Sequence, residues 1–391
     1  MTTTAERAGT VAGPSSESES GSASGSWVFD ADGHIVEPPE TWQRFLPERF
    51  RTYAPRVLQE EDHFRFVCND RLSFRIAGSA ETLAAPGQTP HQTDAPVAAR
   101  GAVDPSARLV DMDVDAIGTA ALYPTFGLMI QGVMEPEPAL ALCRAINDWI
   151  ADYASRDPRR LVGVGVLPMT DAGDALAEAR RCVEELGFRG VWRRPEQFPG
   201  IPALHDEAYE PLWGYLAEAG VPFAFHPGLN GLVPFGYLQD RYGDYFSPIH
   251  AVHFAAEQMM ALTTMVAYGI LERHPALRVA FLECGATWAV PYLYRLDEHL
   301  EIFGFDRGGL SMKPSEYFAR QCFVSVEEVE PGLAEMLARY PESVVFASDY
   351  PHGDGKFPGS TADLLGTDDL TPAQLRAIML DNAVRLYGLG G

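Results

Sequence analysis

The chain has 391 residues and a formal net charge of −24 at pH 7, and its only lysines are Lys313 and Lys356. Because a surface of this charge repels phosphate groups, the composition argues against nucleic acid and anionic membranes as partners. A hydrophobic share of 46% is enough for a large buried core. No segment is apolar over the length of a membrane span, and the N-terminus lacks the apolar core of a secretory signal, so we expect a cytoplasmic protein.

The number and spacing of the cysteines indicate whether the protein has disulfides. The chain has five, scattered without a CxxC pair. An odd number of isolated cysteines argues against a disulfide framework. We therefore expect free thiols in the core.

Residues 1–26 open the chain and contain no aromatic residue. They are rich in Ser, Gly, Ala, Glu and Thr, a composition that cannot offset the entropy lost on ordering. We expect a disordered tail over 1–26, followed by one domain over 27–391.

The first predicted strand covers 27–34 and ends in the sequence DADGH. Alternate residues of an extended strand point to the same side, which groups Asp30, Asp32 and His34. We interpret Asp32 and His34 as functional residues and Asp30 as a structural hydrogen-bond acceptor at the strand end. Residues 50–107 come next and do not fit the pattern of the remaining chain, so we interpret them as an insertion that forms a lid or a dimer arm.

Short apolar runs alternate with amphipathic helical stretches along the rest of the chain. Strands are predicted at 27–34, 118–125, 161–168, 188–195, 222–228, 278–285, 322–328 and 343–351. Helices are predicted at 137–157, 172–186, 205–219, 252–273, 287–303, 331–340 and 371–387. Eight buried strands that alternate with helices are typical of an α/β fold, the (β/α)8 barrel of the TIM type, which commonly needs about 250 residues.

Polar residues of this repeat lie where the predicted strands end. In this fold the carboxyl ends of the strands form the active-site face, so we expect the side chains there to meet. They are Asp32 and His34 on the first strand, Arg193 and Arg194 on the fourth, His226 on the fifth, Glu283 on the sixth and Asp349 on the eighth.

Four motifs resemble the amidohydrolase superfamily, in particular the branch that includes aminocarboxymuconate semialdehyde decarboxylase. They are DADGHIVEP, FHPG, GILERHPALRVAFLECGATWAVPYLYRLD and ASDYPH, and the resemblance extends over residues 28–388. It implies an amidohydrolase-type barrel that binds a divalent metal through His34, His226 and Asp349. Asp32 stands where the family has the first histidine of its strand-one motif. Two imidazoles and two carboxylates favour iron or manganese over zinc.

Other residues depart from the decarboxylases of this branch. Those enzymes place a catalytic histidine where this chain has Glu283, and they often have phenylalanine where it has His352. The helix after the fifth strand carries His253 and Glu257 on one face. We predict that Glu283, His352, His253 and Glu257 complete a second metal site, with Asp32 or Glu283 as the bridging carboxylate. Glu283, His253 and Glu257 are also the predicted catalytic residues, and which of His250, His253 and Glu257 touches metal stays open.

A site of this kind resembles the dinuclear iron monooxygenases with an amidohydrolase fold of bacterial terpenoid antibiotic pathways. The resemblance implies two Fe ions per chain and an O2-dependent enzyme, with an electron donor as a partner, that hydroxylates a bulky, apolar, carboxylate-bearing substrate in secondary metabolism. Arg193 or Arg194 would bind the substrate carboxylate through a forked contact. The aromatic-rich run 230–246 would form an apolar wall.

Alternative interpretations remain open for function and for single residues. A decarboxylase, or a C–C or amide hydrolase, needs one Zn or Mn ion per chain and an acid/base, a role that falls to Glu283. His352 and Glu257 then orient ligands, and Glu283 can instead pair with Arg193 or Arg194. A non-catalytic binding barrel would need no converging ligands. The family resemblance also implies a homodimer.

Overall fold

The computed structural model describes residues 27–59, 63–68, 72–77, 100–228, 236–243, 246–304, 309–353 and 355–389. The predicted tail at 1–26 lies outside the described residues, as does part of the aromatic run, at 230–235 and 244–245. Among the described helices, none combines the length and the apolar character needed to cross a bilayer.

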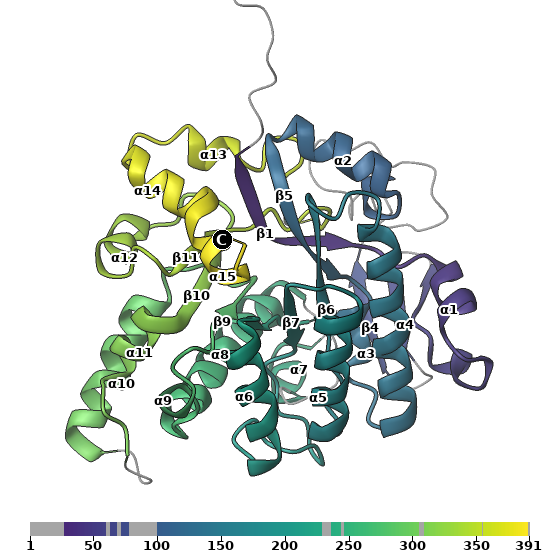
Figure 1. Ribbon diagram of the computed structural model, residues 1–391, viewed down its shortest axis with the longest axis horizontal. Coiled ribbons are helices and arrows are strands. Elements are labelled where there is room, and N and C mark those ends of the chain that lie inside the picture. Colours follow the sequence, from purple (N-terminus) through teal and green to yellow (C-terminus); the bar gives the residue numbers. More distant parts are fainter. Residues whose placement is uncertain are drawn as a thin grey trace, which may run out of the picture.

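Eight parallel strands form a nearly closed barrel (Figure 1). The first and last strands approach each other at their carboxyl ends, where Asp349 N donates to Asp32 O at 3.1 Å and His34 N donates to Tyr350 O at 2.6 Å. The predicted (β/α)8 fold is therefore confirmed, and each predicted strand overlaps an observed one. In spatial order the strands are β1 (Val28–Ile35), β5 (Ile117–Pro124), β6 (Leu161–Val166), β7 (Gly190–Arg193), β8 (Phe223–Phe225), β9 (Val279–Phe281), β10 (Cys322–Val326) and β11 (Val344–Phe346).

Helices cover the outside of this barrel (Figure 1). The seven predicted helical stretches correspond to α4 to α6, α8 to α10, α12, α14 and α15. Those helices are α4 (Pro136–Ala154), α5 (Ala172–Arg180), α6 (Glu210–Ala219), α8 (Phe246–Ala267), α9 (Ile270–Arg273), α10 (Ala289–Phe303), α12 (Leu333–Arg339), α14 (Pro372–Arg376) and α15 (Asn382–Tyr387). The sequence pattern did not predict α1 (Pro39–Phe45), α2 (Pro105–Val114), α3 (Gly127–Ile130), α7 (Gly236–Tyr242), α11 (Pro314–Gln321) and α13 (Ala362–Leu365).

The start of α2 does have a local sequence signal. Asp104 is its N-cap and accepts a hydrogen bond from Ser106 N at 2.9 Å, and Pro105 occupies the first helical position. Both residue types are favoured at these positions, because the cap satisfies a free N–H and proline has none to satisfy. The helix supplies Arg108, which donates a hydrogen bond to His34 O.

The segment predicted as an insertion contains a second, separate sheet. Its strands are antiparallel, in the order β2 (Arg56–Gln59), β3 (His63–Cys68) and β4 (Leu72–Ala77). This sheet explains why 50–107 does not follow the barrel repeat. Its interpretation as a lid or dimer arm stays a prediction.

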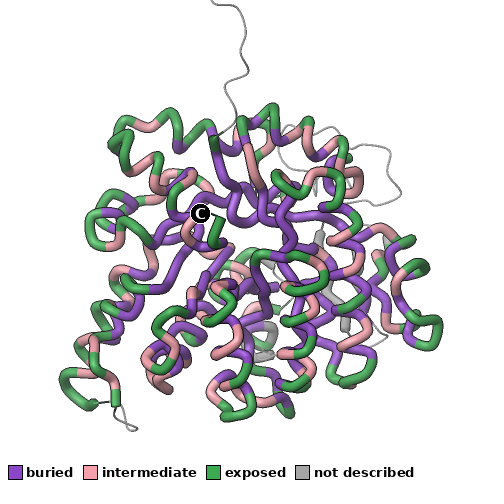
Figure 2. Tube along the Cα trace, in the orientation of Figure 1, coloured by how far each residue is buried: buried purple, intermediate pink, exposed green. Residues whose placement is uncertain are grey.

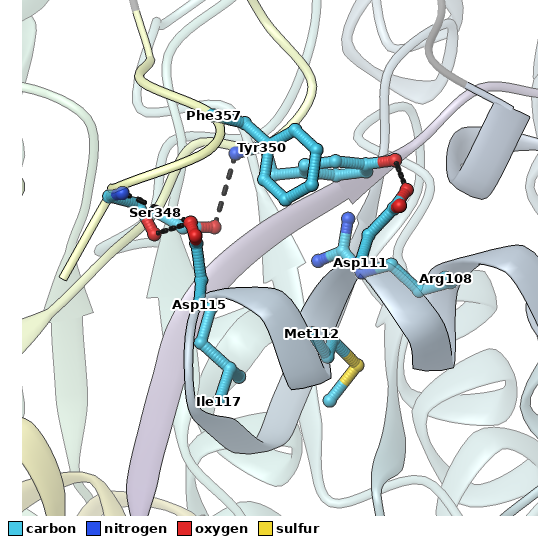
Figure 3. Close-up of a pocket in the computed structure, with 9 residues that line it drawn as sticks. Arg108, Asp111, Met112, Asp115, Ile117, Ser348, Tyr350 and Phe357 are labelled. Atoms are coloured by element: carbon cyan, nitrogen blue, oxygen red, sulfur yellow. Dashed lines mark hydrogen bonds between the residues drawn. The ribbon is translucent and has the colours of Figure 1, made fainter.

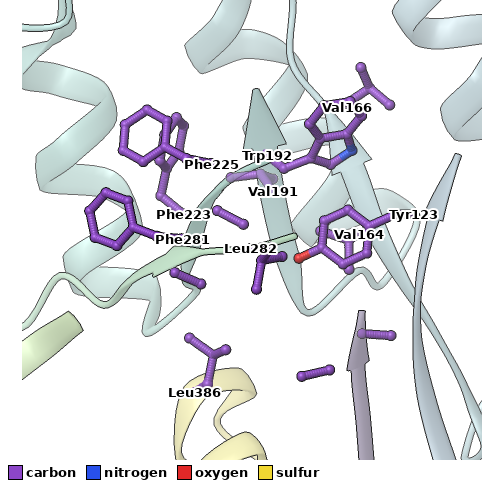
Figure 4. Packing of buried hydrophobic residues seen from close by; sticks show 14 of the residues in the cluster. Tyr123, Val164, Val166, Val191, Trp192, Phe223, Phe225, Phe281, Leu282 and Leu386 are labelled. Atoms are coloured by element: carbon purple, nitrogen blue, oxygen red, sulfur yellow. The ribbon is translucent and has the colours of Figure 1, made fainter. Parts of the chain in front are cut away.

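Large apolar side chains from the strands fill and surround the barrel. Trp192, Phe223, Phe225 and Phe281 are buried, and Figure 4 shows them packed with valines of the neighbouring strands. Burial is concentrated on the strands, whereas exposed residues lie on the outer helices (Figure 2). The cysteines are free thiols, buried except for the half-buried Cys284.

Candidate metal centre

Four side chains from three strand ends converge at the mouth of the barrel. His34 Nε2 lies 3.0 Å from His226 Nε2, and Asp32 Oδ1 lies 3.5 Å from each of these nitrogens. Asp349 Oδ1 lies 3.6 Å from His34 Nε2. Atoms bound about 2.1 Å from a shared ion are roughly 3.0–3.5 Å apart. The separations therefore match those of ligands around one divalent cation.

The hydrogen bonding of these residues also fits a metal. Asp32 is 1% exposed, and its Oδ1 has no hydrogen-bond partner within the described part of the chain. A buried carboxylate oxygen without a donor is costly unless a cation satisfies it. Asp32, His34 and His226 form one of the groupings that could hold an ion. The donor set thus fits a divalent metal held by Asp32, His34, His226 and Asp349.

His34 is in the neutral form that a metal requires. Burial, with the nearby imidazoles of His352 and His226, holds the pKa of His34 well below its usual range. His226 Nδ1 lies 2.7 Å from Pro227 O, an acceptor that requires the proton on Nδ1. Its Nε2 therefore offers a lone pair toward His34 and Asp32.

His352 lies beside the four residues and contacts one of them. Its Nδ1 lies 2.7 Å from Asp349 Oδ1, and its Nε2 lies 3.1 Å from Thr125 Oγ1. The Asp349 carboxylate accepts from His352 Nδ1, and His352 Nε2 shares a hydrogen bond with the Thr125 hydroxyl. This geometry suits a residue that orients Asp349. His34, Asp349 and His352 nevertheless form the second possible metal grouping.

Glu283 lies on the other side of His226. Its Oε2 is 3.2 Å from His226 Nδ1, the nitrogen that faces away from His34. Both Glu283 (φ +56°) and Asp349 (φ +50°) adopt the left-handed backbone conformation, which is rare for residues other than glycine and clusters at functional sites. The strain supports a functional role for these two strand ends.

Arg193 and Arg194 are not open to a substrate. Both are at most 1% exposed. Arg194 Nε lies 3.1 and 3.0 Å from the two carboxylate oxygens of Glu196, and its Nη2 donates to Gly228 O at 2.6 Å. Arg193 Nη1 donates to Tyr209 Oη at 3.2 Å. The prediction that they anchor a substrate is corrected, because their guanidinium groups already donate hydrogen bonds to oxygen atoms of the protein.

The predicted second set of ligands does not come together. The two groupings found among the described residues contain neither Glu283, His253 nor Glu257. His253 Nε2 instead contacts Glu196 Oε1 at 3.0 Å. His250, which is half-buried, packs its ring against Phe254 at 4.0 Å between centroids. The prediction of a second iron site from these residues is corrected in this respect: of its four residues, His352 alone lies in a grouping found among the described residues.

Glu196 and Glu257 form an electrostatic cluster with Arg194 and His253. Although burial favours the neutral acid, Arg194 and His253 hold the pKa of Glu196 at about 2. Burial and the charge of Glu196 raise the pKa of Glu257 to about 8. Glu257 is 2% exposed, and its Oε1 has no hydrogen-bond partner among the described residues. Glu257 is therefore a proton-carrying acid at neutral pH.

Replacing Glu257 by glutamine should make stability less sensitive to pH. The pKa of Glu257 is higher in the folded protein than the ordinary value of 4.5. As the pH rises from about 4.5 to 8, Glu257 ionises in the unfolded chain but stays protonated in the folded protein, and this lowers the free energy of unfolding. We expect Glu257→Gln to be more stable than the parent by an amount that grows over this window, on the order of 4 kcal/mol at pH 8. Urea unfolding from pH 5 to 8 measures it. Glu218→Gln, on the exposed surface of α6, is the control, and a difference that does not change with pH would contradict the prediction.

Sequence reasoning missed three residues that support this site. Glu196 holds Arg194 and His253, Thr125 contacts His352, and Arg108 donates to His34 O at 3.2 Å. Glu196 directly follows the predicted strand 188–195 and Thr125 is the last residue of the predicted strand 118–125, positions that could have indicated them. Arg108 lies in α2, which the pattern did not predict.

Comparisons with known proteins identify the family. A family model described as Amidohydrolase matches residues 30–389. The 2-amino-3-carboxymuconate-6-semialdehyde decarboxylase of Dictyostelium discoideum is 27% identical over 295 residues, which are 73% of this chain and 77% of that protein.

Two solved structures share the fold over their whole length. An amidohydrolase of Mycobacterium avium subsp. paratuberculosis is 24% identical with a TM-score of 0.76, over 93% of this chain and 99% of that one. A 5-carboxyvanillate decarboxylase of Novosphingobium aromaticivorans with bound manganese is 20% identical with a TM-score of 0.67, over 94% and 99%. None of these matches is described as a dinuclear iron monooxygenase, so the resemblance to those enzymes stays a prediction. The family match over almost the whole described barrel shows that this chain belongs to the amidohydrolase family.

Proposed function

We propose that the protein is a decarboxylase that uses one divalent metal ion and acts on a small unsaturated or aromatic carboxylic acid. The observation that carries the proposal is the convergence of Asp32, His34, His226 and Asp349 at the barrel mouth. The decarboxylases among its relatives support the reaction, and the manganese in the 5-carboxyvanillate decarboxylase structure supports the metal. This proposal replaces the dinuclear monooxygenase as the preferred function.

The reaction exchanges a carboxyl group for a proton. The bond between the carbon skeleton and the carboxyl carbon breaks, CO2 leaves, and the electron pair that remains on the skeleton takes up a proton. When bound, the metal acts as a Lewis acid that polarises substrate oxygens. The chain must supply the proton carrier. We assign this role to Glu283, whose carboxyl group lies beside His226 and is 9% exposed.

A dinuclear iron monooxygenase is the second candidate. One observation favours it: His34, Asp349 and His352 form a second possible metal grouping, which shares His34 and Asp349 with the four-residue set. His352 would have to exchange its contact with Asp349 or Thr125 for a metal. The partners would then include O2 and an electron donor. A homodimer is proposed for either function, from the family resemblance alone.

Metal stoichiometry and gas exchange distinguish the two functions. Apoprotein is loaded under anaerobic conditions with Mn(II), Zn(II) or Fe(II), and bound metal is measured by elemental analysis. Release of CO2 is then followed with 5-carboxyvanillate and related hydroxybenzoates, and O2 uptake is recorded in parallel. One ion per chain and O2-independent CO2 release support the decarboxylase. Two irons per chain and O2 uptake support the monooxygenase, and a folded protein that binds no divalent metal contradicts both.

A further inference from the structure

A buried charged pair, Arg108 and Asp30, lies directly behind the metal ligands. Arg108 on α2 is 1% exposed and Asp30 on β1 is 0% exposed. Arg108 Nη2 lies 3.6 Å from Asp30 Oδ2. A register shift between β1 and β5 at Asp30/Gly33 interrupts the regular alternation of side chains. Asp30 therefore faces Arg108 and Ser348, whereas Asp32 and His34 face the metal centre.

The pair holds the backbone of the ligand residues on β1. Asp30 Oδ1 accepts a hydrogen bond from Asp32 N at 3.2 Å, and Arg108 Nη1 donates to His34 O at 3.2 Å. Gly33 lies between these two ligands, and a Cβ there would clash with Arg108 Nη2 and with Asp30 Oδ2, the latter at 2.5 Å. Glycine is required at this position, because only a residue without a side chain lets the charged pair approach the backbone so closely.

The same pair holds the ligand residue at the end of β11. Asp30 accepts from Ser348 N at 2.9 Å and from Ser348 Oγ at 2.6 Å, directly before Asp349. The Arg108 guanidinium lies 4.1 Å from the centre of the Tyr350 ring, directly after Asp349. Asp349 itself has φ +50°. A strained conformation persists only where its surroundings fix it, and here the flanking residues on both sides contact the pair.

Stability alone does not explain this pair. Arg108 Nε and Nη2 have no hydrogen-bond partner among the described residues, and the other side of Arg108 borders a small cavity of about 10 Å³ lined by Tyr350 and Ser348 (Figure 3). Burying two charges is costly, and a pair with incomplete hydrogen bonding recovers little of that cost. An apolar pair of similar size would fill the space at lower cost. What such a pair would lose is the set of directed contacts to the ligand backbone.

We infer that Arg108 and Asp30 are positioning residues that set the geometry of Asp32, His34 and Asp349 and thereby the affinity for the metal. Neither residue touches the metal. They act through backbone and Ser348 contacts on both strands that carry ligands. The inference rests on the metal-dependent function proposed above, but it concerns metal binding and not the reaction that follows.

The test compares Arg108→Met, Arg108→Lys and Asp30→Asn with the parent. Apoproteins are titrated with Mn(II) by equilibrium dialysis, and the d–d spectrum of the Co(II)-loaded proteins reports the ligand geometry. We expect Arg108→Met to bind Mn(II) about 10- to 100-fold more weakly, as is typical when a supporting contact of a ligand is lost. The Co(II) spectrum should change, and Arg108→Lys should restore part of the affinity. Asp30→Asn in the Arg108→Met background should weaken binding by less than it does alone, because the two residues act together.

Arg160→Met is the matched control. Arg160 also donates to strand carbonyls, at 3.0 Å to Gly118 O and 2.8 Å to Ile117 O, but at the start of β5 and away from the ligands. The Arg160→Met variant should be less stable than the parent but should bind Mn(II) with the same affinity. If folded Arg108→Met keeps the Mn(II) affinity and Co(II) spectrum of the parent, the inference fails, whatever the activity. If affinity falls as expected but the parent releases no CO2 from any substrate tested, the proposed reaction fails and the positioning role stands.

Discussion

Replacing His226 by alanine should reduce the metal content of the purified protein from about one ion per chain to less than about a tenth of an ion. His226 Nε2 lies within 3.0 Å of His34 Nε2 and 3.5 Å of Asp32 Oδ1, so its loss removes one of four converging ligands. Activity should fall by at least about 1,000-fold, because metal chemistry contributes several kcal/mol to the barrier. Elemental analysis and circular dichroism of the same preparation check the result and the fold.

Two other histidines make this experiment specific. His299→Ala, on α10 with its Nδ1 facing Arg295 O at 2.9 Å, should keep the full metal content. His352→Ala separates the two candidate functions. It should keep one metal ion per chain if His352 only orients Asp349, and it should reduce a two-iron content to one if His352 is a ligand. A folded His226→Ala protein with its full metal content would show that the four-residue assignment is wrong.

Replacing Arg194 by methionine should lower the free energy of unfolding by about 3–5 kcal/mol. The change keeps the length of the side chain but leaves Glu196 buried without its main positive partner. Breaking one side of a buried pair costs this much because the remaining buried carboxylate loses most of its compensating charge and is not solvated. Urea unfolding at pH 7 measures the loss.

The same experiment separates a structural arginine from a substrate anchor. Lys313→Met removes the exposed partner of Glu301 and should leave the free energy of unfolding close to that of the parent, because solvent screens an exposed pair. Removing both charges, in Arg194→Met with Glu196→Leu, should recover part of the lost stability. If Arg194→Met were as stable as the parent while its KM rose, the buried pairing would be contradicted and the anchor role restored.

The amino-acid sequence determined the barrel and the strand ends that carry its chemistry. Eight apolar runs separated by helical stretches leave few other folds open, because each run must bury both faces. Asp32, His34, His226 and Asp349 follow such runs directly, and the carboxyl ends of parallel strands meet at one face of the barrel. Their convergence could therefore be predicted from local pattern and strand direction alone.

Only the tertiary structure decided which neighbouring side chains join these four. Asp30 is a structural acceptor, as predicted, but only the structure shows that its partners are Ser348 and Arg108. The positive φ values of Glu283 and Asp349 set the direction of the backbone beyond β9 and β11. His253 contacts Glu196, and the charge of Glu196 acts on Glu257, so neither helix residue joins the groupings that could hold a metal. A helical face shows which residues lie together but not which residues of other segments they contact. Arg108 reaches His34 from a helix distant in sequence. Such contacts depend on the packing of segments far apart in the chain, and the local pattern of residues carries no information about them.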